Sequence, residues 1–318
     1  MYIPIIKKYW FIFGLLVVCG ATLFDTTETV AGIGRWLKIH RGPDAVIVLI
    51  FFFSGMVLNV RQIRDGLMDI KGILTALIII FIASPTIAML LSRVPLETGI
   101  VIGIFLVAVM PTTLSSGVVM TGASGGNMAH ALVITILANG LAVFTIPVVL
   151  SFLLTLIGGT TVVNINKMAI MIKIGVLVLL PLAVGLLIKL SAASFIDRFA
   201  SALQISNQCL VLGIVWMAMS LARDTIITSD SRIGIILLLV FFFHGILLAI
   251  AATLITFFKI EKGKRESVVF MGCQKTLPLS VVLQVSLFPQ YGLALVVCVL
   301  HHMVHLLMDG YLVGKLKD

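Results

Sequence analysis

Long apolar runs separated by short polar segments dominate this chain. Between residues 98 and 166 there is no Asp, Glu, Lys or Arg, which is enough apolar sequence for two membrane crossings of about 20 residues each. Runs of this length cross lipid as helices, because barrel strands would alternate apolar and polar side chains. We therefore expect ten transmembrane helices, near residues 9–24, 44–60, 72–91, 99–122, 128–156, 168–190, 205–222, 233–258, 267–288 and 291–313.

Two short segments resemble each other at corresponding places in the two halves. Residues 113–119 read Thr-Leu-Ser-Ser-Gly-Val-Val, and residues 276–282, 163 positions later, read Thr-Leu-Pro-Leu-Ser-Val-Val. The same offset carries each of the first five runs onto one of the last five. Because five crossings leave the chain on the opposite side, the second half enters the membrane inverted. The sequence thus predicts an all-α polytopic protein of two inverted five-helix repeats, residues 1–157 and 158–318.

Both segments interrupt a run with residues that break helices. Pro111 and Gly117 do so in the fourth run, and Gly272 and Pro278 in the ninth. Proline removes a backbone donor, and glycine allows close backbone approach. Two broken, crossing helices would present half-helix N-termini and free carbonyls to a substrate or ion at the membrane midplane. The alternative is that each proline only kinks its helix against its neighbours.

Lys275 stands in the middle of the ninth run. An ammonium at mid-bilayer is costly unless solvated or paired, so it marks a candidate substrate contact; the alternative is that its amine reaches the inner interface. Carboxylates are scarce in the runs, with Asp309 close to the end of the last one. This favours an anionic substrate and argues against sodium dependence. The candidate contacts are Lys275, Gln274 and Thr276 from the ninth helix, Thr113, Ser115 and Ser116 from the fourth, and Asn127, which would cap the start of the fifth.

Histidines give a second candidate site. Of six histidines, five lie in runs: His130, His244, His301, His302 and His305. His301, His305 and Asp309 are spaced i, i+4, i+8 and share one helix face. Interhelical hydrogen bonding is the favoured interpretation, with a proton relay and a zinc site as alternatives. No resident metal or cofactor is predicted, and no catalytic set is recognisable, so the sequence does not predict an enzyme.

Composition and charge agree with a membrane protein. The chain is 60% hydrophobic and 11% charged, against roughly 25% charged in soluble domains. Loops on the side of the N-terminus hold thirteen Lys and Arg and the opposite loops seven, which predicts cytoplasmic termini in a bacterial inner membrane or a plasma membrane. The net charge of +9 is scattered over short loops, so no nucleic-acid partner is expected. Residues 262–265 are expected to meet lipid headgroups, residues 34–40 to form an interfacial helix or an ordinary loop, and no oligomeric state is predicted.

These motifs resemble the bile acid:sodium symporter superfamily over the whole chain. Pro111 with residues 115–116 and 126–127 is similar to the first crossover of that family, and residues 272–275 to its second. The run 274–279 looks most like the branch named sodium/bile acid cotransporter 7. The resemblance implies a core of helices three to five and eight to ten and a panel of helices one, two, six and seven. It also implies a substrate crevice between them and alternating access.

The resemblance also implies where coupling ions would bind. Ser116, Thr135 and Gln274 match the sodium-ligand pattern. Several other ligand positions carry unsuitable residues, and the asparagine that follows the glutamine in the family is replaced by Lys275. These departures are found at Phe270, Ile80, Ala131 and near Gly117. We therefore expect degenerate sodium sites, with the ammonium of Lys275 in place of a cation and sodium or a proton as the candidate coupling ion.

The function expected from the sequence is secondary transport of a small organic anion. A non-transporting regulator of calcium or ion homeostasis is the alternative, suggested by the cotransporter-7 branch. Flux of a solute through the purified protein would separate the two.

Overall fold

The computed structural model describes residues 3–58, 69–113, 116–157, 166–228 and 230–317, and these residues form helices and connecting turns without a strand. The elements are α1 (Ile3–Leu23), α2 (Thr29–Ile39), α3 (Gly42–Val57), α5 (Ile70–Ile78), η1 (Ile79–Ala83), α6 (Ser84–Leu91), α7 (Thr98–Val109), α8 (Ser116–Ala123), α9 (Met128–Thr155), α10 (Lys167–Ile174), η2 (Gly175–Leu179), α11 (Leu180–Ser191), α12 (Ala193–Thr228), α13 (Asp230–Phe257), α14 (Arg265–Cys273), α15 (Leu277–Leu287) and α16 (Gly292–Lys317).

The helices suit a membrane. Within the described residues, seven are long and apolar enough to cross one, or eight if α2 and α3, which meet at 78°, form a bent span. Large apolar side chains such as Phe144, Phe152 and Phe241 are exposed, while Asp309 and His305 are fully buried. The prediction of an all-helical, multi-pass membrane protein is confirmed. The division into ten crossings and two inverted halves stays a prediction.

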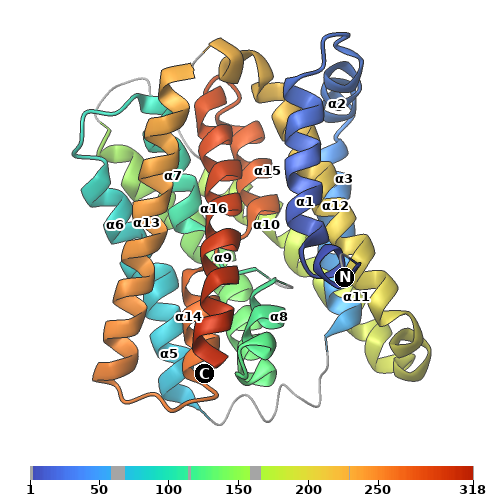
Figure 1. Cartoon of the computed structure of the whole chain (residues 1–318), viewed down its shortest axis with the longest axis vertical. Helices are drawn as coiled ribbons and strands as arrows, with labels where there is room; N and C mark the ends of the chain where they lie inside the picture. Colours follow the sequence, from blue (N-terminus) through green and yellow to red (C-terminus); the bar gives the residue numbers. More distant parts are fainter. Residues whose placement is uncertain (1–2, 59–68, 114–115, 158–165, 229, 318) are drawn as a thin grey trace.

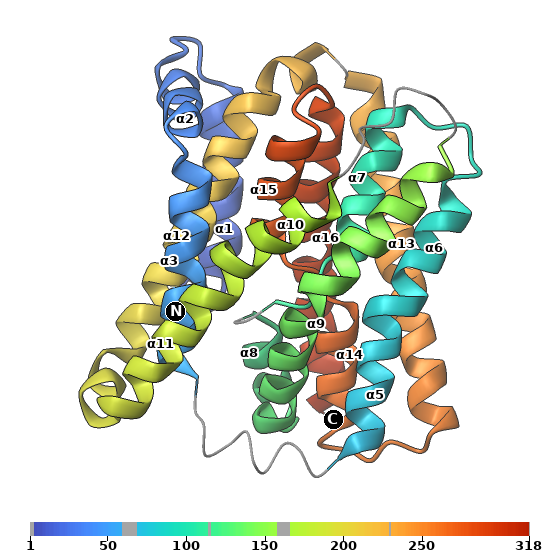
Figure 2. The same cartoon turned by 180° about the vertical axis from the view of Figure 1, so that it is seen from behind.

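Two groups of helices make up the molecule (Figures 1 and 2). In one group, α3 packs against α11 and α12, and α1 packs against α12. In the other, α5 packs on α14, and α16 packs on α7 and α13. Helix α15 contacts α3 and α12 as well as α16, so the second broken helix touches both groups. The division into a panel and a core stays a prediction of the family resemblance, because α12 also packs against α16.

The contact between α3 and α11 depends on two glycines. A side-chain carbon built on Gly55 would collide with the carbonyl of Leu182, and one built on Gly185 with the carbonyl of Phe52. Small residues let membrane helices approach backbone to backbone. Helices α3 and α11 of the first group are therefore closely packed.

The two predicted interruptions are present. Helix α7 ends at Val109 and α8 begins at Ser116, while α14 ends at Cys273 and α15 begins at Leu277. The broken segments meet, because the N–H of Thr276 donates to the carbonyl of Pro111 at 3.0 Å. Residues 110–113 and 274–276 are named the crossover below.

Two π-helical turns precede prolines. Segment η1 lies two residues before Pro85, and η2 lies two residues before Pro181. In η1 the N–H of Ser84 donates to the carbonyl of Ile79, five residues earlier. In that register residue 85 would donate to Ile80, but proline has no N–H. Pro85 therefore leaves the Ile80 carbonyl without its helical donor, and such bulges are frequent at functional sites.

Candidate functional site

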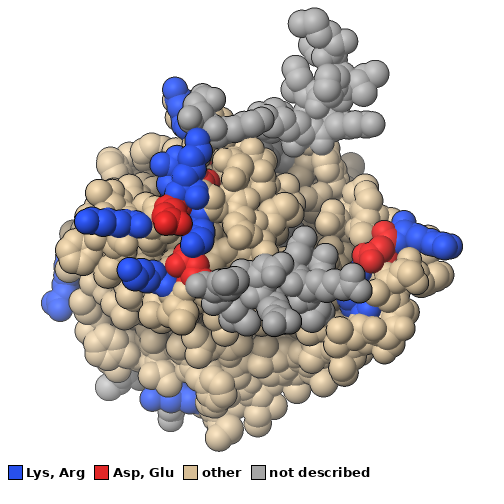
Figure 3. All heavy atoms as spheres, turned by 90° about the horizontal axis from the view of Figure 1, so that it is seen from below, with Lys and Arg blue, Asp and Glu red and all other residues tan. Residues whose placement is uncertain are grey.

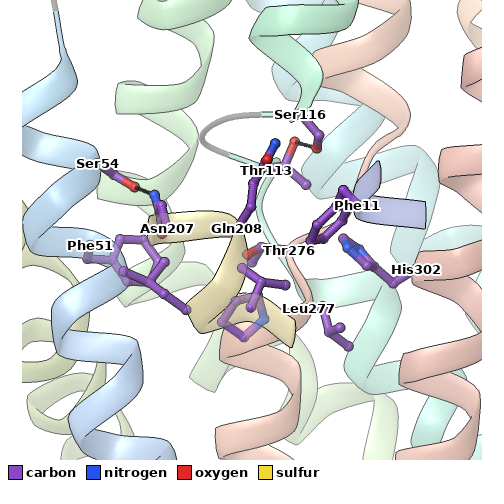
Figure 4. A pocket seen from close by; sticks show the side chains of 13 residues that line it. Phe11, Phe51, Ser54, Thr113, Ser116, Asn207, Gln208, Thr276, Leu277 and His302 are labelled. Atoms are coloured by element: carbon purple, nitrogen blue, oxygen red, sulfur yellow. Dashed lines mark hydrogen bonds between the residues drawn. The ribbon is translucent and has the colours of Figure 1, made fainter. Parts of the chain in front are cut away.

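A cavity lies beside the crossover, between the two groups of helices. Its empty space, about 520 Å³, includes space that is open to the outside. Figure 4 shows side chains converging on it from several helices. The polar wall consists of Thr113, Ser116, Thr276, Ser54, Asn207, Gln208 and His302, and the apolar wall of Phe11, Ile50, Phe51, Val211, Leu277 and Pro278.

Each group of helices supplies polar atoms to this cavity. The N-terminus of α15 reaches it through Thr276, Leu277 and Pro278, and a helix N-terminus favours a negative charge. On the opposite wall the Asn207 amide donates to the Ser54 hydroxyl at 2.7 Å. The amide oxygen of Asn207 is buried and has no hydrogen-bond partner among the described residues.

Gln274 connects the crossover to the interior. Its Oε1 accepts hydrogen bonds from the hydroxyls of Thr113 at 2.7 Å and Ser116 at 3.0 Å. Its Nε2 donates to Oδ2 of Asp309 at 2.8 Å. Because Thr113 and Ser116 line the cavity, the glutamine joins the cavity wall to a buried carboxylate.

Lys275 is buried with 2% of its surface exposed. Its Nζ donates to the carbonyls of Ile80 at 3.1 Å, Ala108 at 3.3 Å and Met110 at 3.0 Å. An ammonium has three N–H donors, and here each has a carbonyl acceptor. The amine therefore does not reach the interface, and the alternative of a snorkelling lysine is wrong.

The π-helical turn before Pro85 and the end of α7 explain why these carbonyls are free to accept hydrogen bonds. Pro85 frees the carbonyl of Ile80, and the end of α7 at Val109 frees those of Ala108 and Met110. The hydroxyl of Ser84 also donates to Ala108, at 2.9 Å. Lys275 is not among the residues that line the cavity, so in this conformation it has no N–H directed at a substrate there.

Asp309 lies deeper in the protein than the sequence indicated. It was expected close to the end of the last helix, but α16 continues to Lys317, and Asp309 is fully buried against Gln274. Its Oδ1 is 2.9 Å from Nε2 of His244 on α13, and its Oδ2 is 3.8 Å from Nδ1 of His305. The packing of α16 thus places this carboxylate in the interior, beside the crossover.

The other predicted residues lie apart from the cavity. The side chain of Asn127 caps α9, because its oxygen accepts the N–H groups of Ala129 at 2.9 Å and His130 at 3.2 Å. The Thr135 hydroxyl donates to the Ala131 carbonyl within the same helix, at 2.9 Å. Neither Asn127 nor Thr135 lines the cavity. Ser115 lies outside the described residues.

The sequence analysis missed the wall formed by α3 and α12. Asn207 and Gln208 are polar neighbours within an apolar helix, and that signal was available. It also left His244 out of the predicted relay, although this side chain binds the same carboxylate. The pairing of residues 65 positions apart does not follow from spacing on one helix.

The fold and the cavity define an integral, multi-pass helical membrane protein built around two broken helices. A sequence model of the SBF-like CPA transporter family matches residues 9–318. The chain belongs to this family.

Curated relatives agree with that assignment. The chain is 30% identical over 280 residues to the "Probable sodium/metabolite cotransporter BASS4, chloroplastic" of Arabidopsis thaliana, a match that covers 83% of the chain and 64% of the relative. It thus spans somewhat less than two thirds of that protein. It is 25% identical over 334 residues to the sodium/bile acid cotransporter 7 of Xenopus tropicalis, covering 98% of the chain and 93% of the relative. The Danio rerio cotransporter 7 is 26% identical over 98% of the chain and 94% of its own length.

Proposed function

We propose that the protein is a secondary transporter that carries a small organic anion by alternating access. The observation that carries this proposal is the cavity beside the crossover, lined by polar and apolar side chains from both groups of helices. Transporters with broken helices bind substrate at such a place. The names of the relatives, sodium/metabolite and sodium/bile acid cotransporters, support the same class.

The anion is held by the α15 N-terminus and the hydroxyls of the crossover. Thr276 binds its negative group, and Thr113 and Ser116 join it by giving up their hydrogen bonds to Gln274. Asn207 on the opposite wall contacts its polar end. Phe11 and Phe51 provide an apolar surface for the rest of the molecule. An anion with a short apolar body fits this division.

Lys275 serves as a built-in cation. Three backbone carbonyls surround its ammonium, and unwound carbonyls of this kind coordinate sodium in transporters with broken helices. Ser116, Thr135 and Gln274 remain from the sodium-ligand pattern of the family, and Phe270 and Ile80 replace other ligands. The tethered charge stabilises the crossover without a bound sodium ion.

Residues 1–157 and 158–318 form two inverted halves with both termini in the cytoplasm. The α13–α14 turn and the α11–α12 turn lie on the lower face in Figure 1, where the C-terminus also lies. Figure 3 shows Lys and Arg along the edges of this face. Lys262 and Lys264 in the α13–α14 turn and Arg198 in the first turns of α12 support a cytoplasmic position under the positive-inside rule.

Uptake into proteoliposomes tests the proposal. The purified protein is offered a radiolabelled bile acid, a keto acid and a dicarboxylate, and both net uptake and exchange are measured. We expect at least one anion to exchange, and Thr276→Val to reduce that exchange about tenfold, because a hydrogen bond to a charged group contributes roughly 1.5–3 kcal/mol.

Thr253→Val is the matched control, since Thr253 is exposed on α13 and should leave exchange unchanged. If the folded protein moves no anion, transport is refuted and the regulator of ion homeostasis is favoured. Equal loss in both variants would refute the role of Thr276.

A further inference from the structure

Five ionisable side chains form a buried cluster next to the cavity. They are Asp309, His301, His302 and His305 of α16 and His244 of α13, and each is 5% exposed or less. The rings of His305 and His301 lie 5.3 Å apart, and those of His244 and His305 lie 5.7 Å apart. This group is called the His–Asp cluster below.

The hydrogen bonds of the cluster leave several nitrogens unused. His244 Nε2 donates to Asp309, and one proton is shared between Nε2 of His305 and Nδ1 of His302, 2.9 Å apart. No hydrogen-bond partner among the described residues is found for Nδ1 of His244, Nε2 of His301, Nε2 of His302 or Nδ1 of His305. A network that served packing alone would satisfy its buried polar atoms. These nitrogens are available to bind water or a proton.

A proton on Nδ1 of His305 fits the geometry, either in the neutral Nδ1–H ring or in the doubly protonated ring. If His305 carries a proton on each ring nitrogen, Nδ1–H points toward the Asp309 carboxylate, 3.8 Å away, and Nε2–H donates to His302. With Nδ1 unprotonated, a lone pair would face the carboxylate instead. A buried carboxylate needs a compensating charge, and an imidazolium at His305 supplies it.

Two paths connect the cluster to the cavity. His302 lines the cavity and bonds to His305, which faces Asp309. Gln274 bonds to Asp309 on one side and to the cavity hydroxyls of Thr113 and Ser116 on the other. A ligand that engages these hydroxyls alters the hydrogen bonds of Gln274, and therefore those of the carboxylate.

The charged neighbours of the cluster are few. Among the described residues, Lys275 is a charged side chain that acts electrostatically on His301, and the neighbouring Cys273 is a thiol. The ammonium of Lys275 is held by its three carbonyls. In the part of the chain that the structure describes, no set of three ligands is placed to hold a metal ion.

We propose that the His–Asp cluster binds the proton that drives transport. The proton passes from water in the cavity to His302, then to His305, where it pairs with Asp309, and it returns to water by the same histidines when the cavity opens to the other side. The covalent bonds made and broken are the N–H bonds of these histidines and the O–H bonds of water. This inference rests on the proposed function and names its coupling ion: a proton moves together with the organic anion.

Transport in sealed proteoliposomes provides the first test. An anion found to exchange in the assay above is offered under an imposed pH gradient, with potassium and valinomycin holding the membrane potential at zero and no sodium present. We expect the wild type to accumulate the anion on the alkaline side. We expect Asp309→Asn and His305→Gln to lose gradient-driven accumulation of the anion. His40→Gln, at the exposed end of α2, is the control and should accumulate like the wild type.

The second test does not depend on transport. Purified protein labelled with ¹³C-histidine is titrated by NMR between about pH 5 and 8, the range in which histidines change charge. We expect a cluster histidine to titrate in the wild type, and its titration to disappear in His305→Gln and to shift in Asp309→Asn.

The outcomes separate the two proposals. The proton site is overturned if exchange does not respond to the pH gradient, or if only sodium drives accumulation. Either result is still consistent with the proposed transport of an organic anion. Absence of titration in the cluster also overturns the proton site. Failure of every anion to exchange refutes the proposed function and, with it, the coupling role.

Discussion

Gln274 and Lys275 are consecutive residues of one crossover, yet they belong to buried charges of opposite sign. Lys275 carries a positive charge, and Gln274 binds the negative carboxylate of Asp309. The ammonium of Lys275 has three donors and three carbonyl acceptors. Gln274 leads to Asp309 and to a cluster in which four ring nitrogens have no partner among the described residues. A fully satisfied buried charge holds one arrangement, whereas an incompletely satisfied cluster can change its protonation. The difference indicates that the charge of Lys275 is fixed and stabilises the structure, whereas the charge of the His–Asp cluster changes and serves coupling.

The largest effect is expected from removing the fixed charge. Lys275→Met leaves the carbonyls of Ile80, Ala108 and Met110 without this donor, and each such loss costs about 1–3 kcal/mol. We expect the free energy of unfolding to fall by about 3 kcal/mol or more, measured as a lower Tm in detergent. Lys189→Met is the control, because Lys189 pairs with the exposed Asp197 and should lose less than ~1 kcal/mol.

The same site gives a test of the built-in cation. Lys275→Asn should gain a sodium-specific rise in Tm that potassium does not produce, since a bound ion stabilises the folded state. The wild type should respond equally to both ions. A sodium-specific rise in the wild type would contradict the assignment of Lys275 as the resident cation.

An intermediate effect is expected from cutting the link between the two regions. Gln274→Leu removes hydrogen bonds to Thr113, Ser116 and Asp309, and it should cost about 2 kcal/mol. It should also separate cavity binding from the protonation of the cluster, so that an added anion no longer shifts the histidine titration. Gln284→Leu is the matched control, because that buried glutamine caps the end of α15; it should lose stability and keep the shift.

A smaller effect should follow from restoring one backbone donor. Pro85→Ala supplies an N–H that competes with Lys275 for the Ile80 carbonyl, at a cost of about 1 kcal/mol. Combined with Lys275→Met the two changes should be non-additive in Tm, because both act on one carbonyl. Pro181→Ala, beyond the second π-helical turn, should be additive with Lys275→Met. Additivity at both prolines would rule out the proposed link.

The smallest effect concerns a carboxylate outside the membrane spans. The N–H of Ala31 and the hydroxyl of Thr27 bind Asp25 and lower its pKa. A lowered pKa in the folded state adds stability above the unfolded value of about 4, and this stability is lost as the pH falls through the folded pKa. Asp25→Asn should therefore have a lower Tm than the wild type at neutral pH, and the gap should close in acid. A gap that widens in acid would contradict this.

The sequence predicted the helical segments and the two breaks because their causes are local. Apolar runs of membrane length require helices, and Pro111 and Pro278 cannot continue one. It also singled out Lys275, since a lysine in such a run needs a partner. It could not show which partner, because the Ile80 carbonyl is freed by a π-helical turn that has no separate sequence signature.

The candidate site was predicted in part. Thr113, Ser116 and Thr276 line the cavity as expected, because they flank the breaks. The opposite wall with Asn207 comes from α12. Because this helix is far from the crossover in sequence, the sequence does not show that the two line one cavity. The i, i+4, i+8 spacing found His301, His305 and Asp309, while His244 required the packing of α13 against α16.

The sequence by itself determined that this chain is helical, lies in a membrane and breaks two of its helices, since lipid leaves backbone groups no other partners and proline has no donor. Only the tertiary structure decided which groups pair with the buried charges. The Lys275 ammonium and the Asp309 carboxylate each need several partners at once, and these are drawn from helices far apart in the chain. That choice depends on how the helices pack.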